Sequence, residues 1–239
     1  MCVLTGAGGQ LGNAFCQKYL KDYDIVAVCR HRAPNVPSQY DSFVDPLDPT
    51  ADVDGGRVFV VHTDLEKEGE PEHVVDLVLA RHGRVDLLVN NAAFSVWHRN
   101  GMIDGDAALN DAARHFAVNV ELPMRLGVRL AQKFWSSRAA ENRAANRNVV
   151  NVSSLAGTGI YGGGQAVYAA SKAAQNQMTR HMAREFDGFG VRVNGLAPNS
   201  FPGIVSTESV ADAVVRLDRE SVTGKILVVD KQTGNTATS

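Results

Sequence analysis

Short apolar runs alternate along this chain with longer amphipathic stretches, and that alternation limits its possible folds more than any other feature. The runs predicted as strands are 1–5, 24–29, 57–62, 84–90, 147–153, 191–197 and 225–230. The stretches with helical periodicity are 10–21, 71–82, 105–135, 166–187 and 207–218. Most of the apolar runs lack a strict in–out alternation, as expected for strands buried on both faces. The order predicts a doubly wound parallel sheet with helices on both sides, a Rossmann-like α/β fold of about seven strands.

The composition is that of an ordinary globular protein. The 239 residues show no internal repeat and no flexible linker, so we expect one domain spanning 1–239. A net charge of −2 does not support binding to nucleic acid or to an anionic membrane, and no apolar run approaches the length of a membrane span. The sparse set Cys2, Cys16 and Cys29 predicts reduced thiols in a cytoplasmic protein, and the scattered histidines predict no metal site.

A glycine-rich turn, TGAGGQLG at 5–12, directly follows the first predicted strand and precedes an amphipathic helix. Glycines allow a tight turn and close approach of a pyrophosphate, whose charge is met by amides at the helix N-terminus. This position at the first strand–helix junction predicts dinucleotide binding.

The second predicted strand ends in CRHR at 29–32, where an acid would hydrogen-bond the adenosine ribose and select NAD. Arg30 and Arg32 are instead suited to bind a 2′-phosphate, so the sequence favours NADP(H) over NAD(H). The alternative is two arginines that simply face solvent. Residues 31–56, with four prolines and five aspartates, predict a long acidic loop, either a solvated excursion or a flap near the adenosine.

Tyr168 and Lys172 lie four apart in VYAASK (167–172), so they share one face of the predicted helix. On its own this spacing also fits an ordinary amphipathic helix. The fifth strand ends in NVSS (151–154), at the edge of the sheet where ligands bind in this fold.

Taken in order, these motifs resemble the compact branch of the short-chain dehydrogenase/reductase family. The resemblance spans nearly the whole chain and rests on TGAGGQLG, Asp64-Leu65, NNAA (90–93), Asn119, NVSS, YAASK and RVNGLAPN (192–199). It implies an enzyme in which Tyr168 is the general acid/base and Lys172 lowers the phenol's pKa from about 10 while holding the nicotinamide ribose. Ser154, preferred over Ser153, would stabilise the substrate oxygen, and Asn119 would hold a water in a proton relay.

The same resemblance assigns a cofactor set: Gly6, Gly9, Gln10, Leu11, Gly12, Arg30, Arg32, Asp64, Leu65, Asn91, Ala92, Ala93, Tyr168, Lys172, Pro198 and Phe201. Trp97, Tyr161 and Phe201 are candidates for lining a mostly apolar substrate pocket, although each also fits ordinary packing. His98 is a candidate for an extra acid, but we expect this loop histidine to be solvated.

Three departures from the family pattern matter. The spacing Gly6, Gly9, Gly12 is that of a longer branch that includes epimerases and dehydratases. Asn199 follows Pro198 where glycine is usual, and Gly203 replaces a threonine. Only residues 199–206 separate the sixth strand from the next helix, which predicts an open site for a bulky or extended substrate unless other loops fill the gap.

The sequence therefore predicts an NADP-dependent oxidoreductase that interconverts a ketone or aldehyde and an alcohol. The alternatives are a non-redox epimerase, dehydratase or lyase with a retained nicotinamide cofactor, and a silent cofactor-binding protein. The resemblance also implies a homodimer or homotetramer formed through 105–135 and 166–187, with a kink at Pro123 in the first.

Overall fold

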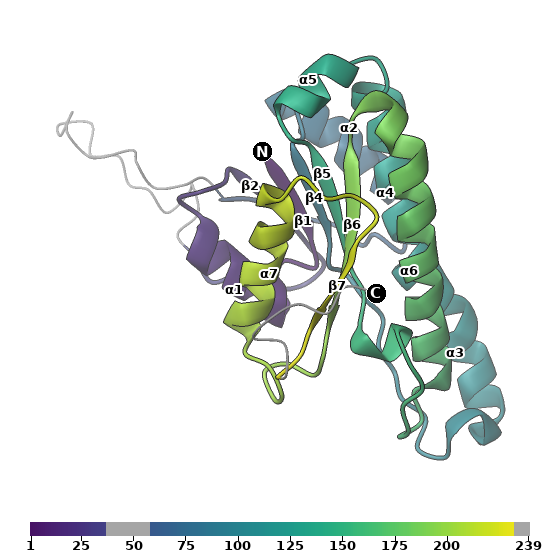
Figure 1. Ribbon diagram of the computed structural model, residues 1–239. Coiled ribbons are helices and arrows are strands. Elements are labelled where there is room, and N and C mark those ends of the chain that lie inside the picture. Colours follow the sequence, from purple (N-terminus) through teal and green to yellow (C-terminus); the bar gives the residue numbers. More distant parts are fainter. Residues whose placement is uncertain (37–57, 232–239) are drawn as a thin grey trace.

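The computed structural model, which describes residues 1–36 and 58–231, contains one seven-stranded parallel sheet flanked by helices (Figure 1). The strands are β1 Cys2–Thr5, β2 Ile25–Cys29, β3 Val58–His62, β4 Leu87–Asn90, β5 Asn148–Val152, β6 Arg192–Pro198 and β7 Ile226–Val229. All seven predicted strands are confirmed, and only β6 extends past its predicted range, by one residue. The doubly wound fold class is confirmed with them.

The helices form two layers that cover the two faces of the sheet (Figure 1). They are α1 Gln10–Tyr19, α2 Glu70–His82, α3 Asp106–Phe116, α4 Leu122–Leu130, α5 Ala139–Ala144, α6 Ala166–Phe186 and α7 Thr207–Arg219. The helices α1 and α7 pack on one face through Phe15 and Val214, and α2, α4 and α6 cover the other through Val78, Leu126 and Phe186. The α5 helix is too short and too polar to have been predicted from periodicity.

The sheet order is β3-β2-β1-β4-β5-β6-β7, so the direction of winding reverses between β1 and β4. Leu4 pairs with Ala27 on one side and with Val89 on the other. Crossovers leave β1 and β4 toward opposite faces, which opens a crevice at the carboxyl ends of these two strands. The glycine turn that follows Thr5 lies at this switch point.

The single kinked helix predicted over 105–135 is instead a series of segments. Between α3 and α4 the chain is π-helical at Ala117–Glu121, and a second π-helical segment covers Ala131–Trp135. Pro123 has no N–H, so it cannot donate the i→i−4 bond that the Asn119 carbonyl would receive in an α-helix. The first π-helical segment, Ala117–Glu121, ends two residues before this proline and contains Asn119.

Two further predictions concern the chain as a whole. Cys2, Cys16 and Cys29 are buried free thiols, as predicted. Among residues 1–36 and 58–231, no helix has the length and apolar character needed to cross a membrane. Most of the predicted acidic loop, 37–56, lies outside the described residues.

Candidate active site

The glycine turn fits closely around backbone, and several of its positions exclude any side chain. Gly6 has φ +64°, and an added Cβ would lie 2.9 Å from the Cα of Ala92. At Gly12 an added Cβ would lie 2.5 Å from the Cα of Ala7, so the glycine allows α1 to start tightly against the turn. Such a cradle of bare backbone beside a helix N-terminus fits a dinucleotide pyrophosphate.

Gly8, which the sequence analysis did not single out, is the most restricted glycine of the turn. A Cβ there would lie 1.8 Å from the carbonyl oxygen of Arg32. The segment after β2 therefore lies directly on the turn, with the Arg32 backbone against Gly8. The sequence shows Gly8 as a fourth glycine of the turn, but only the structure explains why a glycine is needed there, since the Arg32 backbone lies against it.

The other predicted turn residues differ in what they offer a ligand. Gly9 and Gln10 are exposed at the start of α1, whereas the Leu11 side chain is buried in the core, which leaves only its backbone for a ligand. The Asn91 amide donates to the carbonyl oxygens of Thr5 (3.0 Å) and Gly6 (3.1 Å). Asn91 therefore joins the end of β4 to the turn and shapes it.

A pocket of about 210 Å³ lies at the ends of β2, β3 and β4, where the adenosine was predicted to bind. It is lined by six predicted cofactor residues, Gly6, Arg30, Asp64, Leu65, Ala92 and Ala93. The sequence analysis missed Glu66 and Arg114, which also line it. Glu66 could have been noticed as an acid following β3, opposite the basic end of β2; no sequence signal places Arg114 of α3 here.

The two arginines expected to bind a 2′-phosphate are in different situations. Arg30 donates from Nη1 to Glu66 Oε1 (2.9 Å), and Arg114 binds both oxygens of the same carboxylate, at 2.7 Å each. Arg32 is exposed and makes no ion pair with the part of the chain that the structure describes. The sequence analysis expected both arginines either to bind a phosphate or to face solvent. It did not anticipate the ion pair between Arg30 and Glu66.

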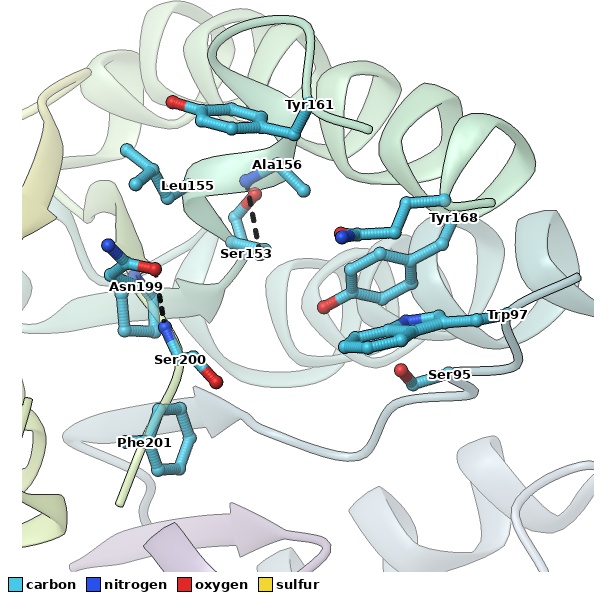
Figure 2. A pocket seen from close by; sticks show the side chains of 13 residues that line it. Ser95, Trp97, Ser153, Leu155, Ala156, Tyr161, Tyr168, Asn199, Ser200 and Phe201 are labelled. Carbon is cyan, nitrogen blue, oxygen red and sulfur yellow. Dashed lines mark hydrogen bonds between the residues drawn. The ribbon is translucent and has the colours of Figure 1, made fainter. Parts of the chain in front are cut away.

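A second pocket, of about 290 Å³, lies at the ends of β5 and β6 (Figure 2). Six predicted residues line it: Ser154, Tyr168, Pro198, Trp97, Tyr161 and Phe201. The lining residues that the sequence analysis did not propose as ligand contacts are Ser95, Ser153, Leu155, Ala156, Gln165, Asn199 and Ser200. The loops around 95–97 and 161–165 both reach the pocket, so they supply part of the covering that the short 199–206 segment lacks.

The Tyr168 hydroxyl points into this pocket, which the Trp97 indole also lines (Figure 2). Burial raises the pKa of the Tyr168 phenol above its ordinary value, and a hydrogen bond with Ser154 acts in the opposite direction. The Ser153 hydroxyl, although Ser153 also lines the pocket, donates to the Lys172 carbonyl oxygen (3.2 Å). The structure thus directs Ser154, and not Ser153, toward the tyrosine.

Lys172 was predicted to lower the pKa of the Tyr168 phenol, and the structure does not show this effect. Its Nζ lies 5.9 Å from the centre of the Tyr168 ring and donates to the Val152 carbonyl (2.9 Å) and to Gln175 Oε1 (3.0 Å). The side chain is 1% exposed, and burial lowers the pKa of its ammonium from 10.5 to about 7. The predicted lowering of the tyrosine pKa is therefore wrong here, because burial is the main effect on both groups.

Asn119 is fully buried and uses its side chain to position other elements. Its Oδ1 accepts from the Phe94 amide (2.9 Å), and its Nδ2 donates to the Phe94 carbonyl (2.9 Å) and to Ser171 Oγ (3.0 Å). These bonds join the segment after β4 to α6 one residue before Lys172. The Asn119 side chain is therefore occupied by contacts within the protein, and its role in a water relay stays a prediction.

Two histidines lie next to the site. His98 is 7% exposed and its Nε2 lies 3.2 Å from Asp111 Oδ2, so the expectation of a solvated side chain was wrong. His115 is fully buried between the rings of Phe94 and Tyr168, with centroid distances of 4.7 and 5.9 Å, and its burial lowers the pKa of the imidazole. A neutral His115 ring therefore packs against the catalytic candidate.

A glycine turn at the switch point of a doubly wound sheet, with a serine and a tyrosine facing a pocket beside it, defines a dinucleotide-binding α/β protein. The chain belongs to the short chain dehydrogenase family, whose model it matches over residues 1–216. It is an oxidoreductase of this family, and membership implies a nicotinamide cofactor.

Curated relatives act on chemically different substrates. The chain is 33% identical to secoisolariciresinol dehydrogenase of Forsythia intermedia over 59% of its length, and the match spans about half (48%) of that relative. It is 28% identical to meso-2,3-butanediol dehydrogenase of Serratia marcescens, covering 82% of this chain and 69% of the relative. The structure of acetoin dehydrogenase from Salmonella typhimurium superposes with a TM-score of 0.77 at 20% identity, covering 100% of this chain and 99% of that one. At that identity the likeness shows the fold alone.

Proposed function

We propose that this protein is an NADP-dependent oxidoreductase that interconverts a ketone or aldehyde and an alcohol. The observation that carries the proposal is the Tyr168 hydroxyl, directed into a pocket beside Ser154 with Lys172 four residues further along the same helix. The bound nicotinamide cofactor would supply or accept the hydride. The residues of the chain would orient the substrate and handle the proton.

In the direction of reduction, Tyr168 gives its hydroxyl proton to the substrate oxygen as the carbonyl carbon receives the hydride. The Ser154 hydroxyl, within hydrogen-bonding reach of Tyr168, also donates to the substrate oxygen, so the negative charge that develops there is stabilised. The raised pKa of Tyr168 keeps the phenol protonated at neutral pH, which suits it to this donation. In the reverse direction the phenolate accepts the alcohol proton.

Lys172 and Asn119 are proposed to return a proton to Tyr168 after each reduction. A lysine with a pKa of about 7 exchanges its proton readily at neutral pH, as an efficient acid/base group must. The Asn119 carbonyl, in the π-helical segment before Pro123, is suited to hold a water that connects Lys172 to solvent. Lys172 would also hold the nicotinamide ribose.

The preference for NADP(H) is supported by the basic groups around the adenosine pocket. Arg30 lines that pocket, and Arg32 lies on the glycine turn at Gly8. A 2′-phosphate between them would receive charge-assisted bonds that a ribose hydroxyl cannot match. Asp64 and Leu65 are proposed to contact the adenine, and Pro198 and Phe201 the carboxamide end.

The substrate is proposed to be uncharged, with an apolar body. The lining of the catalytic pocket contains Trp97, Tyr161 and Phe201, and none of its thirteen described lining residues carries a formal charge. A phosphate or carboxylate on the substrate would have no charged partner among them. Trp97 and Tyr161 are 59% and 45% exposed, which supports an open site for a bulky compound.

We also propose a cytoplasmic homodimer or homotetramer that uses the long helices. The proposal is supported by exposed apolar side chains on α3 and α4: Leu109, Phe116, Met124 and Val128 are each more than one-third exposed. Apolar surface of this kind on a helix pair is typical of contacts between subunits.

The test is turnover of NADPH and of NADH by the wild type and by Tyr168→Phe against neutral and charged carbonyl compounds. We expect oxidation of NADPH with bulky neutral ketones, and a loss of about 10²–10⁴-fold in Tyr168→Phe while NADPH binding is kept. Tight cofactor binding without oxidation by any compound would contradict the proposal and favour a non-redox reaction, for which the spacing of Gly6, Gly9 and Gly12 is the present support.

A further inference from the structure

The adenosine pocket contains a charged cluster, the Arg30–Glu66–Arg114 triad, which brings together three segments far apart in sequence. Arg30 follows β2, Glu66 follows β3 and Arg114 lies on α3, with side chains 45%, 31% and 43% exposed. The Glu66 carboxylate binds Arg114 through both oxygens and shares Oε1 with Arg30. The hydrogen bond from Arg114 is the main reason that the pKa of Glu66 lies below its ordinary value, so the carboxylate is ionised at neutral pH.

The charge of the triad depends on Arg114. Two guanidinium groups and the Glu66 carboxylate give the triad a net charge of +1, which the nearby Asp64 carboxylate brings to zero for the site as a whole. Without Arg114, Glu66 would fully neutralise Arg30, and Asp64, whose Oδ1 lies 4.0 Å from Arg30 Nη1, would make the surroundings negative. An anion placed at Arg30 would then meet a repulsive field.

The geometry also holds Arg30 in place. Only Nη1 of Arg30 is bonded to Glu66, and its remaining N–H groups have no partner among residues 1–36 and 58–231. The contact at Nη1 leaves the Nε and Nη2 edge of the guanidinium open, and this edge suits bidentate binding of a phosphate. The planar Arg114 group is itself fixed by stacking over the Phe94 ring, 4.2 Å from its centre.

We infer that Arg114, acting through Glu66, determines the preference for a 2′-phosphorylated cofactor by preventing a net negative charge at the Arg30 site and by keeping Arg30 ordered. The inference rests on the proposed NADP preference. Arg114 is a specificity-determining residue here without being the phosphate ligand: it compensates the carboxylate that would otherwise cancel Arg30. Glu66 has a double role: it orients Arg30, but without Arg114 its negative charge would repel a phosphate bound at Arg30.

The test measures binding of two probes, adenosine 2′,5′-bisphosphate and AMP, by titration calorimetry, so that it does not depend on turnover. Arg114→Met keeps an apolar stem over Phe94 and removes the charge. We expect it to weaken the bisphosphate about fivefold and AMP less than about twofold, because exposed charge interactions are of this size. The double variant Glu66→Gln/Arg114→Met should return the bisphosphate to within about twofold of the wild type.

Arg129→Met is the matched control, because Arg129 makes a similar two-contact pair with Asp76 on α2 and does not line the adenosine pocket. It should change neither affinity. Equal weakening of both probes by Arg114→Met, or no recovery in the double variant, would overturn the inference alone. A wild type that binds the two probes equally would instead refute the proposed NADP preference, and the inference with it.

Discussion

Replacing the buried Lys172 by methionine gives a quantitative test of the site's electrostatics. Methionine is close in length to the lysine stem, so the substitution removes the ammonium and keeps most of the packing. Burial lowers the pKa of Lys172 from 10.5 to about 7 in the folded protein. Between these two values the unfolded chain binds a proton that the folded protein does not, so the stability of the wild type rises with pH in this window.

The size of the effect follows from the same two values. A tenfold difference in proton affinity corresponds to about 1.4 kcal/mol, so the wild type should gain about 1.4 kcal/mol per pH unit relative to Lys172→Met above pH 7. Between about pH 7.5 and 9.5 the difference in unfolding free energy should grow by about 2–3 kcal/mol in favour of the wild type. Methionine also leaves the Val152 carbonyl and Gln175 Oε1 without their donor, but that cost does not depend on pH.

The assay is urea denaturation of both proteins at several pH values in this window. Other titrating groups are common to the two proteins and cancel in the difference. Lys67→Met, at an exposed position, is the matched control and should give a difference that does not change with pH. A flat difference for Lys172→Met as well would refute the reasoning, because it would mean that the folded protein does not depress the lysine pKa.

Three other substitutions test separate parts of the structure. Gly6→Ala should weaken NADPH binding at least tenfold, as measured by fluorescence titration, because its Cβ would meet the Ala92 backbone at a φ of +64°; unchanged affinity would contradict the cradle. Ser154→Ala should lower kcat on the order of 10²-fold with little change in cofactor affinity, and an unchanged kcat would remove Ser154 from the mechanism. Trp135→Ala should cost about 3–5 kcal/mol in thermal or urea unfolding, since the buried indole also donates to the Val85 carbonyl (3.0 Å); a loss below 1 kcal/mol would show that the core collapses around the gap.

Local patterns in the sequence were sufficient for the strands and for the glycine turn. Parallel strands buried on both faces need continuous runs of apolar residues, so the seven strands are visible without tertiary information. Ser154 directly follows β5 and Tyr168 lies in the first turn of the next long helix, α6, and both line one pocket at this edge of the sheet. The glycine turn was equally visible, since a positive φ and close backbone contacts leave glycine as the residue that fits.

The pairing of charges and the burial of titratable groups were decided by the tertiary structure alone. Arg30 and Arg114 meet on Glu66 from three different elements, and nothing in the spacing of these residues indicates the contact. His98 was expected in solvent and is instead buried beside Asp111, because the loop after β4 packs on the 158–165 loop. Lys172 could be located from sequence but its pKa could not, since desolvation depends on every element that covers the side chain. Apolar periodicity and glycine turns are local requirements of the backbone, so they can be recognised in the sequence. Ion pairs and desolvation arise between distant segments, so they form only once the helices are packed on the sheet.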